Sequence, residues 1–264
     1  MSKHITSQKN PFIKNILALQ KKSSERKKQG VFIIEGFREI QLALSGGYTF
    51  THLVICPDIF NQNQLKNRKL PGTEIVKISG NVYQKIAHRS TTEGIIGIGK
   101  TKDFSLSKLQ FKNKNPLILV AEAPEKPGNI GALLRTADAA GLDGVIIANP
   151  KTDMYNPNIV RSSVGCLFTV PIATGGTSEI ISFLKEQKIK IYGAALTASE
   201  HYHKINFKKS SAIVVGTEAT GLSIEWLNNT DQNIVIPMEG KIDSLNVSVS
   251  AAILIFEAKR QRRA

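Results

Sequence analysis

Cysteine is almost absent from this sequence. Cys56 and Cys166 are the only two in 264 residues, too few for a disulfide framework or a zinc cluster. Histidine is sparse as well. His201 and His203 have no further cysteine, histidine or acidic cluster near them, so we interpret the pair as part of a surface loop. We therefore expect no bound metal, and the cysteine usage fits a reducing, cytoplasmic environment.

Long apolar runs are also missing. Every run is far shorter than the roughly 20 residues of a membrane-spanning helix. Residues 1–15 lack the continuous apolar stretch of a signal peptide. The sequence therefore predicts no membrane association. A hydrophobic content of 41% nevertheless allows a sizeable core, and the length suits one large domain or two small ones.

Acidic residues are few relative to basic ones. The chain has 35 Lys and Arg against 21 Asp and Glu, a formal net charge of +14. The excess is uneven, because residues 1–105 carry 17 basic and 7 acidic side chains, whereas 106–264 carry 18 and 14. A basic excess in one part of a chain favours a polyanion-binding module over a merely solvated basic surface. We interpret the first hundred residues as such a module.

Helical and strand-like segments are expected to alternate along the chain, which indicates an α/β protein. A helix is predicted over 10–29 with a solvated basic end, and strands and helices follow to residue 102. Residues 103–115 are polar and basic, and we interpret them as a linker. From 116 to 264 a second series begins. Its strands, such as LILVA and AIVVG, are apolar without alternation, as in a parallel sheet covered on both faces.

One literal motif match is rejected. Gly94 to Thr101 fits the phosphate-binding pattern G-x-x-x-x-G-K-[ST]. That mechanism needs an apolar strand before the glycines and a helix after them, so that backbone N–H groups surround the phosphates. Polar residues flank the match on both sides, and its isoleucines make it strand-like. A nucleotide-dependent enzyme is thus a hypothesis that ATP binding would test, and we do not favour it.

Three other stretches are unusual for a pure scaffold: 127–141 (PGNIGALLRTADAAG), 214–223 (VVGTEATGLS) and 236–263. In each case an apolar strand leads into a turn of glycine or small polar residues, and a helix follows the turn. Any one of them could be a capped helix with structural glycines. Open α/β sheets, however, bind ligands at the carboxyl ends of their strands. The three together therefore predict a ligand site at that edge.

These stretches resemble the three motifs of the SpoU (TrmH) family of RNA ribose 2′-O-methyltransferases, which belongs to the SPOUT class. The resemblance rests on NIGALLRTA, GTEATGLS and IPMxGxxxSLNVSV, in that order and spacing. It implies a trefoil-knotted, parallel-sheet α/β methyltransferase domain over 116–264, preceded by a small L30e-like α/β substrate-binding domain over 1–102. It also implies S-adenosylmethionine as cofactor and a homodimer.

The resemblance implies roles for two sets of residues. Those assigned to catalysis are Arg135, Asn129, Glu218, Ser244 and Asn246. Those assigned to the cofactor pocket are Leu196, Gly216, Ile236, Met238 and Leu245. The role of Arg135 is left open between general base and phosphate positioner. Arginine keeps its proton in nearly all protein settings, which favours phosphate binding.

The expected reaction is methyl transfer to a ribose 2′-hydroxyl of RNA, with ribosomal RNA favoured over transfer RNA and no DNA expected. A catalytically inactive RNA-binding protein and a transfer-RNA enzyme are the alternatives. The intact Arg135, Glu218 and Asn246 argue against the inactive form. One departure from the family pattern is Lys126, which stands where many members have Asp or Asn before the first-motif proline. It adds positive charge at the rim of the expected site.

Overall fold

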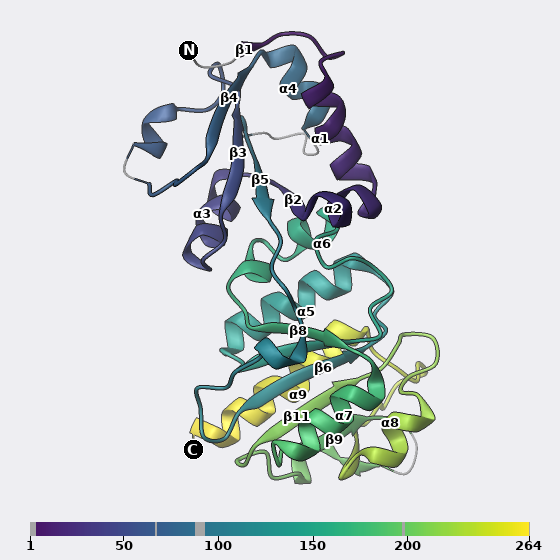
Figure 1. Cartoon of the computed structure of the whole chain (residues 1–264). Coiled ribbons are helices and arrows are strands. Elements are labelled where there is room, and N and C mark those ends of the chain that lie inside the picture. Colours follow the sequence, from purple (N-terminus) through teal and green to yellow (C-terminus); the bar gives the residue numbers. More distant parts are fainter. Residues whose placement is uncertain (1–3, 67, 88–92, 197–198, 264) are drawn as a thin grey trace. The chain divides into compact units, whose positions relative to one another are not determined.

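The computed structural model describes residues 4–66, 68–87, 93–196 and 199–263. Figure 1 shows the course of the chain. It divides into two compact units, one formed by Met1–Lys102 with Asp153–Thr169 and the other by Asp103–Thr152 with Val170–Ala264. The first unit thus takes in a segment from the middle of the second predicted domain. Among the described residues, no helix has the length and apolar character needed to cross a membrane.

The first unit contains a five-stranded sheet in the order β1-β4-β3-β5-β2. β5 is antiparallel to β2 and β3, whereas the remaining pairs are parallel. The strands are β1 (His4–Ile5), β2 (Val31–Glu35), β3 (Phe50–Ile55), β4 (Glu74–Ile78) and β5 (Ile95–Lys100). The helices are α1 (Pro11–Lys21), α2 (Ser23–Gln29), α3 (Phe37–Ser45), α4 (Gly80–Ile86) and α6 (Pro157–Ser162), with 3-10 turns at Gln62–Leu65 and Cys166–Phe168. Residues 95–100 of the rejected phosphate-loop match form β5, so the prediction that this segment is strand-like is confirmed.

The prediction of one continuous helix over 10–29 is wrong, because the helix is interrupted at Lys22, between α1 and α2. Lys22 has an extended backbone, with φ −115° and ψ 117°. Arg26 was expected in a solvated basic end, yet it is only 3% exposed. It donates to the carbonyl of Leu19 (2.6 Å) and pairs with Asp153 (2.7 Å). The arginine thereby satisfies a helix-end carbonyl that would otherwise lack a partner.

Segment 153–169 is part of the hydrophobic core of the first unit. Tyr155 stacks on Phe32 with 5.0 Å between ring centroids, and Phe168 lies 5.1 Å from the same ring. Tyr48 packs edge-on against both Phe32 and Phe168. Burial of its hydroxyl raises the pKa of Tyr48. This aromatic cluster holds a sequence-distant segment against the sheet.

The second unit is built on a seven-stranded sheet in the order β10-β12-β9-β11-β6-β7-β8. Every strand pair in it is parallel, as predicted. β6 and β11 are buried along their whole length, which explains their unalternating apolar sequences. The strands are β6 (Leu117–Glu122), β7 (Gly144–Ala148), β8 (Ile172–Gly175), β9 (Lys190–Ala194), β10 (Glu200–His201), β11 (Ser211–Val215) and β12 (Gln232–Val235).

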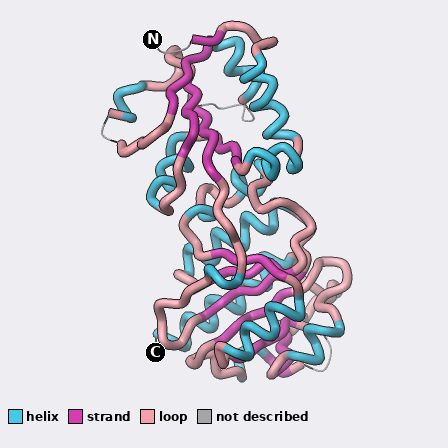
Figure 2. Tube along the Cα trace, in the orientation of Figure 1, coloured by secondary structure: helices cyan, strands magenta, loops and turns pink. Residues whose placement is uncertain are grey.

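Helices cover both faces of this sheet (Figures 1 and 2). α5 (Pro127–Ala140) packs on α9 (Val247–Arg263) along one face, and α7 (Thr177–Glu186) packs beside α8 (Ile224–Asn229) on the other. 3-10 turns lie at Leu106–Lys108 and Tyr202–Lys204. The segment expected as a linker, 103–115, packs on this unit. Leu106 and Leu109 are buried in its core, and Ser105 bridges to Thr174.

Candidate functional site

The three unusual stretches meet at the carboxyl edge of the seven-stranded sheet, as predicted. β6 leads into α5, β11 leads into a tight turn at 216–221, and β12 leads into the segment before α9. In the turn, Thr217 and Gly221 exchange backbone hydrogen bonds of 3.0 and 3.1 Å. A Cβ on Gly216 would lie 2.1 Å from the carbonyl carbon of Gly221. Only glycine therefore allows this close approach.

A cavity of about 470 Å³ opens at this edge. Its walls come from 194–196, 215–222, 234–236 and 243–245, together with Leu227, Met238, Val247 and Ser250. The five residues expected to bind the cofactor all line it: Leu196, Gly216, Ile236, Met238 and Leu245. The volume lies within the range of roughly 300–1,000 Å³ typical of small-molecule sites. Leu196 is 62% exposed, so an apolar surface at the mouth is available to a ligand.

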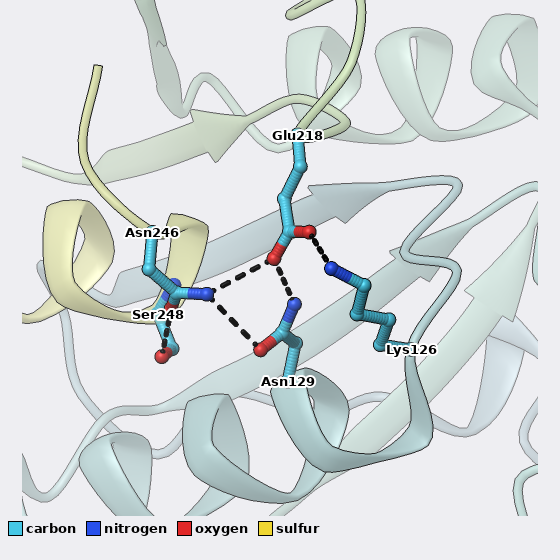
Figure 3. A network of polar contacts seen from close by, with 5 residues as sticks. All are labelled: Lys126, Asn129, Glu218, Asn246 and Ser248. Atoms are coloured by element: carbon cyan, nitrogen blue, oxygen red, sulfur yellow. Dashed lines mark hydrogen bonds and ion pairs between the residues drawn. The ribbon is translucent and has the colours of Figure 1, made fainter. Parts of the chain in front are cut away.

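A polar network lies beside the cavity and shares Glu218 with it (Figure 3). Lys126 Nζ pairs with Glu218 Oε2 at 2.6 Å. Asn129 and Asn246 both donate from Nδ2 to Glu218 Oε1, the latter at 3.0 Å. Asn246 Nδ2 also lies 3.3 Å from Asn129 Oδ1, and its own Oδ1 accepts from the backbone N–H and hydroxyl of Ser248. Both amide NH₂ groups thus point toward one carboxylate.

The network favours the ionised form of Glu218. The hydrogen bond from Lys126 lowers the pKa of this carboxyl, and the bond from Asn129 adds to the effect. Reciprocally, the Glu218 carboxylate raises the pKa of Lys126. A carboxylate that accepts several hydrogen bonds is a poor proton acceptor. Glu218 is therefore suited to orienting the two amides and ill suited to acting as a general base.

The other two predicted catalytic residues lie outside this network. Arg135 is exposed on α5, six residues beyond Asn129, or about 9 Å along the helix axis. Among the described residues its side chain has no hydrogen-bond or ion-pair partner. Ser244 lines the cavity and donates to Asp243 Oδ1 at 3.1 Å. The structure thus brings together three of the five predicted catalytic residues.

Three residues that contribute were not among the predicted site residues. Ser248 fixes the Asn246 amide. Lys126 was interpreted only as added charge at the rim. Glu122, which is 6% exposed at the end of β6, accepts a 2.8 Å hydrogen bond from the backbone N–H of Ser223 and so anchors the second loop. The available signal was a carboxylate at the end of an otherwise apolar strand.

Two family models match the chain. The SpoU rRNA Methylase family matches residues 116–256. The MRM3-like substrate binding domain matches residues 10–97.

Individual proteins match almost the whole chain. The 23S rRNA (guanosine(2553)-2′-O)-methyltransferase RlmP of Bacillus subtilis is 30% identical over 257 residues, which cover 97% of this chain and 99% of that protein. A crystal structure of an RNA 2′-O ribose methyltransferase superposes with a TM-score of 0.85 and 35% identity, covering 99% of this chain and all of that one. The AdoMet-bound rRNA methyltransferase of Sinorhizobium meliloti has a TM-score of 0.90 and 28% identity, with 98% of both chains covered.

Proposed function

The chain belongs to the SpoU rRNA methylase family, and on that premise we propose that it transfers a methyl group from S-adenosylmethionine to a ribose 2′-hydroxyl of ribosomal RNA. The observation that carries the proposal is the placement of a small-molecule cavity directly beside a polar network, with Glu218 belonging to both. The 23S rRNA target named for the Bacillus subtilis relative favours ribosomal RNA over transfer RNA. Action on ribosomal RNA in turn supports a cytoplasmic location.

The cavity residues suit S-adenosylmethionine. Ile236, Met238 and Leu245 offer apolar walls for an adenine ring, and Gly216 lets backbone groups approach a ligand closely. Leu196 adds an exposed apolar side chain to the lining. When bound, S-adenosylmethionine would supply a methyl group on a sulfonium, whose C–S bond breaks readily because a neutral thioether leaves. The protein must then orient the 2′-hydroxyl toward the methyl group. The proton that the hydroxyl loses passes to solvent, because Glu218 and Arg135 are both poor proton acceptors.

We assign the orientation of the ribose to Asn129, with Asn246 as the residue that positions it. The Glu218 carboxylate holds Asn129 and Asn246 in fixed rotamers. An amide has two N–H donors and an oxygen with two lone pairs. Asn246 uses both donors on Glu218 and Asn129 and both lone pairs on Ser248. Asn129 keeps one N–H and one lone pair for a ribose hydroxyl. Ser244 lines the cavity wall beside them. Arg135 keeps its proton, and its exposed guanidinium suits the phosphate next to the target ribose.

Methyl transfer is tested with radiolabelled S-adenosylmethionine and purified bacterial 23S ribosomal RNA, followed by nuclease digestion and identification of the methylated nucleoside. We expect a 2′-O-methylated ribose. Asn246→Ala should lower the transfer rate by at least about 100-fold, because positioning effects of this kind are large, while calorimetry shows S-adenosylmethionine still bound. A base-methylated product, or label only in transfer RNA, would contradict the assignment.

We also propose the homodimer and the knot that the resemblance implies. Val249 and Phe256, seven residues apart on one face of α9, are 46% and 48% exposed. Apolar side chains at this spacing form a stripe that a second copy can cover. Sedimentation at micromolar concentration should give twice the 28.9 kDa of the chain, and Phe256→Glu should give the monomer.

For the knot, the packing of α9 on α5 and of β12 between β9 and β10 supports threading of the last segment.

A further inference from the structure

Lysine is concentrated at the end of the seven-stranded sheet opposite the cavity. β9, β11 and β6 are parallel neighbours in that order, so their amino ends lie at one edge with about 5 Å between strands. The segment before each strand is basic. Exposed lysines at or just before these ends form what we call the amino-end rim: Lys112, Lys114, Lys185, Lys188, Lys190, Lys208 and Lys209.

Arg262 of α9 fixes two of the loops that carry this rim. Its guanidinium donates to the carbonyls of Asn115 (2.6 Å) and Pro116 (3.4 Å) before β6. It also donates to the carbonyls of Phe207 (2.8 Å) and Lys209 (2.5 Å) before β11. One side chain thus bonds four carbonyls in two loops. The lysines on those loops are therefore presented on an ordered backbone.

The loop before β11 is in turn joined to β9. Lys190 donates its backbone N–H to the carbonyl of Ser210 (3.1 Å), and the two strands pair from Lys190 and Ser211 onward. Beyond β9 lies a groove of about 400 Å³ lined in part by Lys185, Lys188 and Lys190. The lysines before the three strands therefore lie on segments that are bonded to one another.

Few acidic groups offset this charge. Asp143 accepts from the backbone N–H of Leu117, and Asp231 accepts from that of Ile191, both at 2.8 Å. Each carboxylate thus caps the amino end of a strand. Glu186 is the acidic residue next to Lys185 in the sequence. Seven lysines and Arg262 outnumber these three carboxylates, so the rim is strongly positive.

The rim does not belong to the site described above. The cavity begins at the carboxyl ends of β9 and β11, at Ala194 and Val215. These strands have five residues each, which places the rim about 16 Å away along the sheet. None of the large exposed apolar side chains of the described residues lies in the rim. A protein interface normally needs such apolar or aromatic anchors, whereas phosphate contacts need mainly lysine and arginine.

We propose that the amino-end rim is a second RNA-binding surface, which holds the phosphate backbone of ribosomal RNA independently of its sequence and away from the reacting ribose. The proposal rests on the proposed function for the identity of the RNA. Its physical basis is counterion release, because each phosphate that the rim neutralises frees condensed cations from the RNA. The rim therefore contributes to affinity and not to the transfer step.

The test compares two double charge reversals in the full chain. The rim variant is Lys188→Glu with Lys209→Glu. The control is Lys151→Glu with Lys204→Glu, two exposed lysines of the same unit outside the rim. Affinity for purified bacterial 23S ribosomal RNA is measured across salt concentrations. S-adenosylmethionine affinity, measured by calorimetry, reports that each variant is folded.

The rim variant should bind at least about tenfold more weakly at low salt, with its slope of log affinity against log salt reduced by about 1.5. The control should change affinity by about twofold at most. With saturating RNA the rim variant should transfer methyl groups at the wild-type rate. Equal losses of RNA affinity in both variants would show that net charge alone matters. Unchanged affinity in the rim variant would show that the rim is merely a solvated surface. Either result overturns the proposal. Failure of the wild type to methylate RNA would instead refute the proposed function.

Discussion

At the scale of single residues, Lys126 is the side chain whose role changes most between sequence and structure. It pairs with Glu218, and this contact is the main reason why the pKa of Glu218 lies below its ordinary value. The carboxylate must be ionised to accept from both amides. The charged form is present above the pKa of the folded protein and is lost as the pH falls through it. A lower pKa therefore keeps the network intact at lower pH.

Lys126→Met should accordingly move the acid limb of the pH–rate profile to higher pH. Removal of the ammonium lets the pKa of Glu218 return toward its ordinary value, so the network is protonated earlier on acidification. Transfer rates at saturating RNA, measured from pH 4 to pH 8, report the shift. Lys126→Arg keeps the charge and should leave the acid limb near its wild-type position. Identical limbs in all three proteins would contradict the role given to Lys126.

Arg135 permits a second prediction at this scale. It is exposed on α5 and does not line the cavity. Arg135→Ala should abolish methyl transfer while S-adenosylmethionine affinity stays within a few-fold, because the loss concerns the RNA phosphate. Isothermal titration and a transfer assay separate the two effects. Loss of cofactor affinity in a folded variant would show that Arg135 acts on the cofactor side.

At the scale of elements, the turn between β11 and α8 determines the shape of the cavity. Its two ends approach so closely that a Cβ on Gly216 would collide with the backbone of Gly221. Backbone cannot move aside as the end of a flexible side chain can, so the turn must open. The cavity wall from 215 to 222 then shifts as a whole.

Gly216→Ala should therefore weaken S-adenosylmethionine binding by at least about tenfold, which is roughly 1.4 kcal/mol, and should lower the melting temperature. Gly128→Ala is the matched control. Gly128 lies in the first turn of α5, and a Cβ there would meet nothing within 4 Å. Replacing it should leave affinity unchanged. Calorimetry and thermal unfolding measure both variants, and equal affinities would show that the turn tolerates a side chain.

At the scale of the whole molecule, the basic first unit is expected to supply much of the RNA affinity. Removing residues 1–102 should weaken binding to 23S ribosomal RNA and flatten its dependence on salt, since phosphate contacts are lost. The remaining chain should still bind S-adenosylmethionine, because the cavity is lined by residues beyond 193. Affinities at several salt concentrations test this, and equal slopes for the two chains would leave the first unit without an RNA-docking role.

The structure adds a condition to this truncation. Segment 153–169 packs in the first unit, where Tyr155, Ile159 and Phe168 are buried. Without that unit these side chains would face water and promote aggregation. The truncated chain should therefore carry polar replacements at the three positions. Light scattering of the truncated chain with and without them checks this expectation.

The sequence by itself determined the α/β class, the parallel second sheet and the position of the ligand site. Parallel strands that are buried on both faces must be apolar at successive positions, so β6 and β11 could be recognised from their amino-acid sequences. Loops at carboxyl strand ends must gather at one edge, so the three motifs could be placed together. The five cavity residues and the grouping of Asn129, Glu218 and Asn246 followed from the resemblance of these motifs to a known family.

Only the tertiary structure decided which side chains complete these features. Arg26, which lies just after the break between α1 and α2, meets Asp153, 127 residues away, and no local pattern encodes such a partner. The same holds for the contact of Lys126 with Glu218 and for the Arg262 bonds to carbonyls some 55 and 147 residues distant. Hydrophobic periodicity and turn chemistry act over a few residues of sequence. Buried charges and loop carbonyls instead need hydrogen-bond partners, and only folding brings those partners within reach.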